Sequence, residues 1–284
     1  MIRIDIVRSR CGCPMKLSIV SWNVEGVLPD ARFAEVLRAL GDPDVLCLQE
    51  ICIRASDEIR VAAMASALPG YHAHYSLNRD AQNVLVRGGR SYGVATYWKE
   101  SLGPARAEVP DWDLEGRVVF TRFNEFTLAN VYAVNGTSKP YFDHELGRFE
   151  GDRHAFKRRF QRMVFERAAK FSPVILAGDW NVSQAQIDVH PRLRTEEPHV
   201  RARAEFLELA ESAGLVDAYR HLSANAKGYT WFSRRSRTLD AARVDFFLVS
   251  EDLVPITTSA RIFDDPKFRR HTDHAPIGLI IDGS

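Results

Sequence analysis

The stretch SPVILAGDWNVSQAQIDVH, Ser172 to His190, holds the pattern from which the fold can be worked out. Four apolar residues, Val174 to Ala177, run without interruption into Gly178. A short apolar run that ends at glycine is typical of a buried strand. Asp179 and Asn181 follow directly. Because side chains two apart in an extended chain point to the same side, these two should lie together just beyond a core strand.

Further strand-like segments recur along the rest of the chain. Besides residues 173–178, they cover residues 16–22, 44–49, 93–98, 117–123, 126–134, 243–250 and 275–281. Apolar residues at helical spacing predict three helices: residues 33–40 after Asp30, residues 156–163 after Gly151, and residues 206–213 closed by Gly214. Strands that follow both strands and helices predict an α/β (α+β) fold, a four-layer α/β/β/α sandwich with two packed mixed sheets flanked by helices.

The composition is that of an ordinary globular protein, with 45% hydrophobic and 26% charged residues among 284. The sequence contains no apolar run of about 18 residues, the length that could span a membrane. The N-terminus lacks the apolar core of a secretory signal. We expect one domain over residues 15–284 and a tail, residues 1–14, outside its core. Cys11, Cys13, Cys47 and Cys52 form neither a disulfide framework nor a zinc pattern, which favours a reducing cytoplasm.

Basic residues gather in three segments although the net charge is only +1. These segments are Arg153–Arg162, His190–Arg203 and Phe232–Arg237. One such segment alone is usually a solvated face, but three in a near-neutral chain indicate a basic rim around an acidic centre.

Polar residues also collect where the predicted strands end or begin. They are Asn23, Glu25, Glu50, Tyr132, Asn135, Asp245, Asp273 and His274. Each alone has an ordinary explanation, such as an Asx-turn, a solvated glutamate or a core tyrosine. Their repetition at strand ends is harder to assign to turns.

These residue types suit metal-assisted hydrolysis of a phosphoester. Glu25, Glu50 and Asp273 are hard oxygen donors for Mg²⁺, with Mn²⁺ able to replace it. Asp179 can serve as a base or orient a water, and Asn23 and Asn181 can hydrogen-bond a phosphate or that water. Paired with a carboxylate, His274 would be a charged donor to a phosphate oxygen. A set without cysteine ligands fits this chemistry better than zinc chemistry.

The motifs SWNVEG, DVLCLQE, EGRVVFTRF, NVYAVNG, ILAGDWNVSQAQIDV, TWFSRRSRTLDAARVDFFLVS and TDHAP occur in this order. From Leu17 to Ile281 their order and spacing resemble the exonuclease III-like apurinic/apyrimidinic endonucleases of the endonuclease/exonuclease/phosphatase superfamily. The resemblance implies a Mg²⁺-dependent DNA-repair nuclease that cuts double-stranded DNA 5′ to abasic sites and trims damaged 3′ ends as a 3′–5′ exonuclease. It further implies a cytoplasmic monomer, associated with the nucleoid in a bacterium, with no membrane partner.

Residue roles follow from the resemblance. Glu50 matches the principal metal ligand, and Glu25, where the family usually has aspartate, completes the metal set with Asp273. Asp179 matches the residue that activates the water, with Asn181 beside it. Asp245 matches the residue that orients His274, and Tyr132 and Asn135 match ligands of the scissile phosphate, with Asn23 as a further substrate ligand.

The resemblance also marks a pocket for the extruded sugar, and the clustering of basic residues predicts a set of contacts to the DNA backbone. The pocket residues are Trp231, Phe232, Ala242 and Val244, and the backbone contacts are Arg158, Arg159, Arg234, Arg235 and Arg237. Two positions depart from the family. Cys52 replaces a common lysine, and Ala242 replaces a bulky residue, which predicts a roomier pocket and weaker selectivity for abasic sites.

Two other functions stay open from the sequence. One is a Mg²⁺-dependent phosphatase or phosphodiesterase of the same superfamily that acts on a small phosphoester, although the basic segments and TWFSRRSR argue against it. The other is a non-catalytic binding module, although such a module should have lost ligands and none is missing here.

Overall fold

The computed structural model describes residues 16–27, 33–86, 89, 91–137, 139–191, 193–234, 240–270 and 272–284. The predicted tail, residues 1–14, lies outside the described residues, and so do Arg235 and Arg237. None of the helices in the described part of the chain is both long and apolar enough to cross a membrane.

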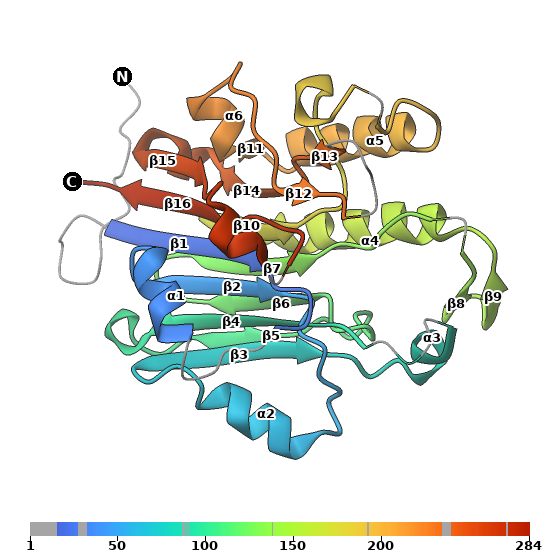
Figure 1. The fold of residues 1–284 in the computed structure, drawn as a ribbon, viewed down its shortest axis with the longest axis horizontal. Coiled ribbons are helices and arrows are strands. Elements are labelled where there is room, and N and C mark those ends of the chain that lie inside the picture. Colours follow the sequence, from blue (N-terminus) through green and yellow to red (C-terminus); the bar gives the residue numbers. More distant parts are fainter. Residues whose placement is uncertain are drawn as a thin grey trace.

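Two six-stranded mixed sheets form the centre of the described structure (Figure 1). The first has the order β15 (Thr257–Ile262), β16 (Ile277–Asp282), β1 (Lys16–Asn23), β2 (Val45–Gln49), β4 (Gly93–Lys99) and β3 (Tyr71–Leu77). The second has the order β11 (Leu215–Asp217), β14 (Asp245–Ser250), β10 (Val174–Asp179), β7 (Thr127–Tyr132), β6 (Val118–Arg122) and β5 (Arg106–Glu108). In each sheet only the central pair is parallel: β1 with β2, and β10 with β7.

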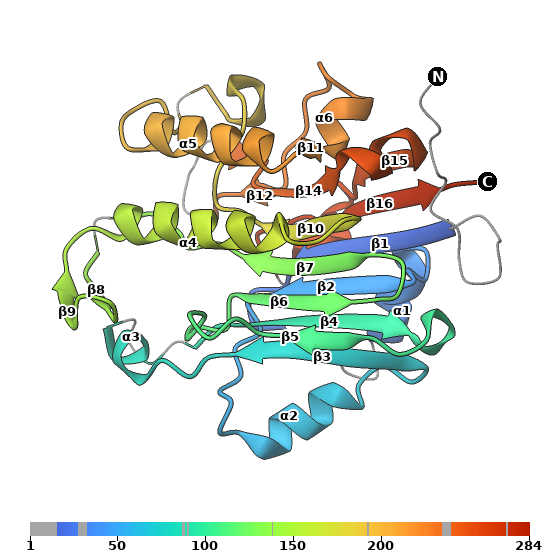
Figure 2. The ribbon, with the colours of Figure 1, turned by 180° about the vertical axis from the view of Figure 1, so that it is seen from behind.

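Helices cover the outer faces of both sheets (Figures 1 and 2). On the first sheet, α1 (Phe33–Ala39) and α2 (Glu58–Ala65) pack through residues such as Leu37 and Met64. On the second sheet, α4 (Arg153–Ala168) and α5 (His199–Ser212) pack through Phe165 and Phe206. The predicted four-layer α/β/β/α sandwich is confirmed.

Smaller elements complete the described chain. They are the helices α3 (Ala81–Val86) and α6 (Ala218–Leu222), the strand pairs β8 (Tyr141–Asp143) with β9 (Arg148–Glu150) and β12 (Trp231–Phe232) with β13 (Ala241–Ala242), and short 3₁₀ segments at Glu100–Leu102, Gln186–Asp188, Glu251–Ile256 and Pro266–Arg270.

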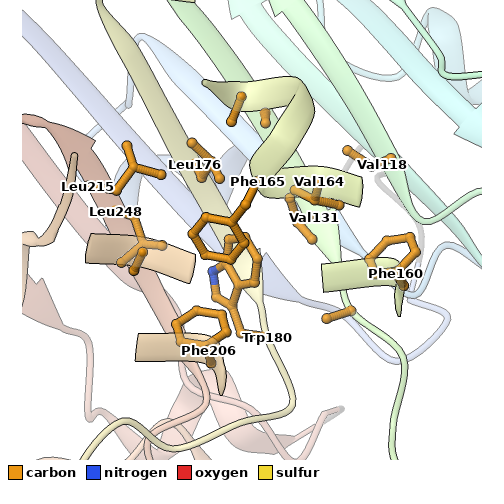
Figure 3. Packing of buried hydrophobic residues seen from close by; sticks show 14 of the residues in the cluster. Val118, Val131, Phe160, Val164, Phe165, Leu176, Trp180, Phe206, Leu215 and Leu248 are labelled. Atoms are coloured by element: carbon orange, nitrogen blue, oxygen red, sulfur yellow. The ribbon is translucent and has the colours of Figure 1, made fainter. Parts of the chain in front are cut away.

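The side chains of β10 alternate between the two faces of its sheet, so one apolar run packs both against the helices and against the other sheet. In β10, Val174 and Leu176 face the helices, whereas Ile175 and Ala177 face the other sheet. Trp180 directly follows and lies between Phe165 of α4 and Phe206 of α5 (Figure 3), at ring-centroid distances of 5.6 and 5.3 Å. The run is uninterrupted because both faces of the strand are buried.

A pair of buried amides joins the two sheets. Gln49 on β2 donates from Nε2 to Oδ1 of Asn130 on β7 at 2.7 Å. Asn130 Nδ2 in turn donates to the carbonyl oxygens of Leu48 and Ala95 at 3.2 and 2.9 Å. An unpaired buried amide costs about 1–3 kcal/mol, so these bonds favour one alignment of the sheets.

The eight predicted strands and three predicted helices are confirmed, with α5 beginning earlier than predicted, at His199. Gly214 adopts a left-handed φ of 62° just after α5, as a C-cap requires. The prediction missed β3, β15 and the short elements α2, α3 and α6. The exposed faces of β3 and β15 carry no clear alternation, and helices of five to eight residues show too few turns for a period.

Candidate active site

Four polar side chains occupy inward positions at one end of the sandwich. Asn23 ends β1, Asp179 ends β10 and Tyr132 ends β7, while Asp245 begins β14. Asp179 is level with both Tyr132 and Asp245 in the sheet register. The carboxyl ends of two parallel strands meet at the same edge, which for β1 and β2 is on the right in Figure 1. Both sheets therefore contribute to one polar cluster.

Asn23 connects the two sheets within this cluster. Its Nδ2 donates to Oε1 of Glu50 at 2.9 Å and to Oδ2 of Asp179 at 3.0 Å. Thr272 Oγ1 donates to the Asn23 carbonyl oxygen at 2.8 Å. Asn23 is fully buried, so one amide fixes the spacing between Glu50 and Asp179.

His274 and Asp245 form a buried pair beside Asp179. His274 Nδ1 lies 2.8 Å from Asp245 Oδ2, and His274 Nε2 lies 3.8 Å from Asp179 Oδ2. Burial alone lowers the pKa of His274, but the charges of Asp245 and then Asp179 outweigh it and raise this pKa to about 10. Burial and then Asp245 raise the pKa of Asp179 above its usual range. The imidazole is therefore a charged donor at neutral pH, aimed at Asp179.

The sequence reasoning missed Thr230, which positions Asp245. Thr230 Oγ1 accepts hydrogen bonds from the backbone N–H groups of Val244 and Asp245, both at 3.0 Å, and the residue is fully buried. Its place in the motif TWFSRRSR was the available signal.

Thr230→Val should leave both N–H groups without an acceptor. We expect the free energy of unfolding to fall by about 1–3 kcal/mol, and the pKa of His274 to fall because Asp245 is held less firmly. Denaturant unfolding and an NMR titration of the imidazole measure the two effects. Thr258→Val, at an exposed position of β15, is the control. If Thr230→Val and Thr258→Val lowered the free energy of unfolding and the pKa of His274 equally, Thr230 would not position Asp245.

The hydrogen bonds from Asn23 to Glu50 and Asp179 are called the Asn23 bridge below. The acidic residues Glu25, Glu50 and Asp273 lie on its outer side. The backbone N–H of Asp273 donates to Oε2 of Glu25 at 3.3 Å. Burial, and then the charges of Asp273 and Glu50, raise the pKa of Glu25, although Arg234 opposes this with an ion pair of 3.1 Å. Carboxylates that repel one another in this way suit a hard divalent cation, but the ligand atoms of Glu25, Glu50 and Asp273 do not all lie within 4.8 Å of one another in the described structure.

A second acidic group lies deeper. Ligand atoms of Asp179, Asp245 and His274 all lie within 4.8 Å of one another. His274 and Asp245 are already hydrogen-bonded to each other, so we interpret this group as a His–Asp pair beside a second carboxylate. Of the two groups, the outer acidic residues have more free oxygens for a cation.

Three of the polar residues have a left-handed backbone. Glu25, Glu50 and Asn181 have φ values of 46°, 57° and 52°. Such a conformation costs about 1–2 kcal/mol for most L-residues and persists where the surroundings enforce it. Asn181 is held by its N–H, which donates to Asp179 Oδ1 at 2.9 Å, and by its Nδ2, which donates to the Ala133 carbonyl at 2.9 Å.

Tyr132 is a buried, neutral phenol. Burial, and then the charge of Glu50, raise its pKa well above the usual value. The guanidinium of Arg117, a residue that the sequence reasoning missed, lies 4.8 Å from the Tyr132 ring and is paired with Glu115. Asn135 lies exposed after the end of β7.

The pocket residues require a correction. Ala242 and Val244 are fully buried in a small cluster with Val189, and Leu193 and Trp231 pack over them. Ala242 has no exposed surface and is closely packed, so among the described residues it does not widen a pocket as predicted. Phe232 is partly buried, with the guanidinium of Arg269 at 4.0 Å from its ring. Trp231 lies nearest to the acidic residues, because its Nε1 donates to Asp273 Oδ2 at 3.0 Å.

The arginines predicted to contact DNA are partly engaged within the protein. Arg158 pairs with Glu205 at 3.2 Å, and Arg159 pairs with Asp143 at 2.9 Å. Arg234, which pairs with Glu25, keeps half of its side chain exposed. Of the three described arginines, Arg234 has the most exposed side chain and lies beside the acidic residues.

Known proteins resemble this chain over most of its length. The profile of the Endonuclease/Exonuclease/phosphatase family matches residues 20–274. The chain is 29% identical over 282 residues to the DNA-(apurinic or apyrimidinic site) endonuclease of Dictyostelium discoideum, with 94% of this chain and 71% of that protein aligned. It is 29% identical over 287 residues to the exodeoxyribonuclease of Bacillus subtilis (strain 168), with 94% and 100% aligned. The AP endonuclease LMAP from Leishmania major shares the fold with a TM-score of 0.74 at 22% identity, covering 94% of this chain and 88% of that one.

Proposed function

The chain belongs to the endonuclease/exonuclease/phosphatase family, and on that premise we propose that it is a divalent-metal-dependent DNA-repair nuclease. Its reaction is hydrolysis of the phosphodiester bond 5′ to an abasic site in double-stranded DNA, with 3′–5′ exonuclease or 3′-end trimming as a second activity. The single observation that carries the proposal is the Asn23 bridge. Through this bridge, Glu50 and Asp179, which come from different sheets, accept hydrogen bonds from the same side chain. Asp179 also lies next to the charged imidazole of His274. The names of the relatives, an AP-site endonuclease and an exodeoxyribonuclease, support the choice of DNA.

Each residue then has a chemical task. Asp179, whose pKa is raised toward neutrality, accepts a proton from the attacking water, and Asn181 orients that water. His274, as an imidazolium, donates to a phosphate oxygen on which negative charge develops, and Asp245 keeps its other nitrogen oriented. Tyr132 and Asn135 hold the scissile phosphate.

The donor set of Glu25, Glu50 and Asp273 fits Mg²⁺, or Mn²⁺ in its place. When bound there, the ion would stabilise negative charge on the phosphate oxygens. The proposal includes a monomer that acts in the cytoplasm, and on the nucleoid in a bacterium, and a single catalytic domain over residues 15–284.

The test is a duplex with one abasic analogue, incubated with Mg²⁺ or with EDTA beside a matched undamaged duplex. We expect one cut 5′ to the analogue with Mg²⁺ and none with EDTA. Hydrolysis of a small phosphoester such as p-nitrophenyl phosphate, with the abasic duplex left intact, would assign a phosphatase instead. Full cleavage in EDTA would contradict the metal requirement.

Glu50→Gln tests the metal set more narrowly. The change keeps the size of the side chain and the acceptor for Asn23 but removes one negative charge. We expect the Mg²⁺ concentration for half-maximal cleavage to rise at least tenfold, with activity partly restored at high Mg²⁺. Glu58→Gln, at an exposed position of α2, is the control. An unchanged Mg²⁺ requirement in Glu50→Gln would exclude this residue as a ligand.

A further inference from the structure

Basic side chains from three segments meet beside Asn181. Lys157 and His154 come from α4, Arg194 from the segment before α5, and Arg203 and His199 from α5. These five residues are called the basic cluster below. The side chain of Lys157 is only 1% exposed. Its Nζ donates to the carbonyl oxygen of Asn181 at 2.6 Å, so the cluster directly contacts the candidate active site.

The positive charges of the cluster have little compensation within the protein. Arg194 Nη1 donates to Ser183 Oγ at 3.3 Å, and Arg203 Nε donates to the Ser183 carbonyl at 2.8 Å. Within the described part of the chain, no ion pair joins Lys157, Arg194 or Arg203 to a carboxylate.

The pKa values reflect the surplus of positive charge. Burial, and then Arg194, lower the pKa of Lys157 to about 7. Burial, and then Arg194 and Lys157, lower the pKa of His199 to about 4, although Glu196 lies 3.8 Å away. Burying cations without partners is unfavourable, so the cluster is expected to gain an anion when the protein binds its ligand.

The cluster lies beside the candidate catalytic residues. The Arg194 guanidinium lies 5.8 Å from the ring of Trp231, and the charges of Asp179 and Asp245 oppose the lowering of its pKa. Arg194 has a left-handed φ of 55°, and Arg203 Nη2 donates to its carbonyl oxygen at 3.5 Å. Arg203 therefore contributes to holding Arg194 in this unusual backbone conformation.

One imidazole of the cluster packs against the loop that follows β7. His154 Nδ1 is buried without a hydrogen-bond partner among the described residues. A Cβ placed on Gly136 would lie 2.3 Å from this nitrogen. Since Gly136 directly follows Asn135, the loop expected to hold the scissile phosphate runs against the cluster.

We propose that Arg194, supported by Lys157 and Arg203, binds a second phosphate group of the nucleic acid strand, next to the scissile one. This inference rests on the proposed function for the source of the phosphate. A guanidinium offers a planar fork of donors that matches phosphate oxygens. The ring of Trp231 lies beneath the Arg194 guanidinium. The site therefore offers donors for a phosphate next to an aromatic ring. The phosphate is either an internal one of the strand or a terminal one at a damaged 3′ end.

The main variant is Arg194→Met, with Arg201→Met as the matched control. Arg201 lies on α5 seven residues further on, is exposed, and pairs with Glu205 at 2.7 Å. Binding to an undamaged duplex is measured without divalent metal over a range of salt concentrations. We expect the slope of log affinity against log salt to fall by about 0.9 in Arg194→Met, the value for one lost phosphate contact, and to stay unchanged in Arg201→Met.

A second measurement needs no DNA. At constant ionic strength, replacing chloride by inorganic phosphate should raise the unfolding temperature of the wild type and of Arg201→Met more than that of Arg194→Met, which keeps only the proposed site of the scissile phosphate. If Arg194→Met does not fold, Arg194→Lys keeps the charge without the fork and should retain only part of the phosphate effect. Phosphate stabilisation that depends on Arg194, in a protein that cuts no DNA, would reject the proposed function and keep the phosphate site.

Two nicked duplexes distinguish an internal phosphate from a terminal one. One duplex ends in a 3′-phosphate at the nick and the other in a 3′-hydroxyl. A loss of affinity for both in Arg194→Met assigns an internal phosphate, and a loss only for the first assigns a terminal one. An unchanged salt slope together with an unchanged response to inorganic phosphate would overturn the inference.

Discussion

Asp179→Asn should lower the rate of abasic-site cleavage by about 10²–10⁴-fold, the usual cost of removing a positioned base. The amide keeps the shape and can still accept the hydrogen bond from Asn23, but it loses the one from the Asn181 N–H and cannot take a proton from water. Affinity for the duplex should change little, because Asp179 is buried at the end of β10 and faces the reacting atoms. Single-turnover cleavage and equilibrium binding to the abasic duplex measure the two quantities.

Without metal, the same variant should lose less stability than the missing hydrogen bond from Asn181 alone would cost. The pKa of Asp179 is raised in the folded protein, by burial first and by Asp245 second. An aspartate of this kind favours the folded state when protonated, so its ionised form weakens folding as the pH rises above the ordinary value of 3.8. At pH 8 the neutral amide removes this cost. Asp265→Asn, at an exposed position, is the control. Cleavage within a few-fold of the wild type would show that Asp179 is not the base.

Gly178→Ala should be the most damaging change of a single methyl group. Gly178 has a φ of 143°, and a Cβ there would lie 1.9 Å from the carbonyl oxygen of Val131. The neighbour is backbone of the adjacent strand β7 and cannot move aside alone. We expect the free energy of unfolding to fall by about 3 kcal/mol, and cleavage to fall with it because Asp179 is the next residue.

Gly151→Ala is the matched control, because nothing lies within 4 Å of the added Cβ. Denaturant unfolding compares the two variants. If Gly178→Ala were as stable as Gly151→Ala, the close approach of β10 to β7 would not be what requires glycine at this position.

The core of the site was predictable because strands impose a simple rule on side chains. Val174 to Ala177 predicted a strand buried on both faces, and that strand fixes where Asp179 lies. The same rule places Asn23, which explains how a side chain 156 positions away in the sequence reaches Asp179.

Other features depend on contacts that no periodicity encodes. Lys157 was interpreted as part of a basic segment, since nothing local distinguishes a buried cation from its exposed neighbours. The position of Arg194 depends on its left-handed backbone conformation. Ala242 is covered by Leu193 and Trp231, which come from other segments. The unusual backbone of Glu25 and Glu50 likewise follows from the assembled site.

The position of β16 in the first sheet has a consequence for how the protein is made. His274 and Asp273 lie just before this strand, which lies between β15 and β1 and is the last strand among the described residues. A ribosome that has synthesised Glu50 and Asp179 has therefore not yet supplied the charged imidazole. A nascent or prematurely terminated chain would carry Glu25, Glu50 and Asp179 but neither Asp273 nor His274. The proposed nuclease activity should thus appear only after β16 docks against β1.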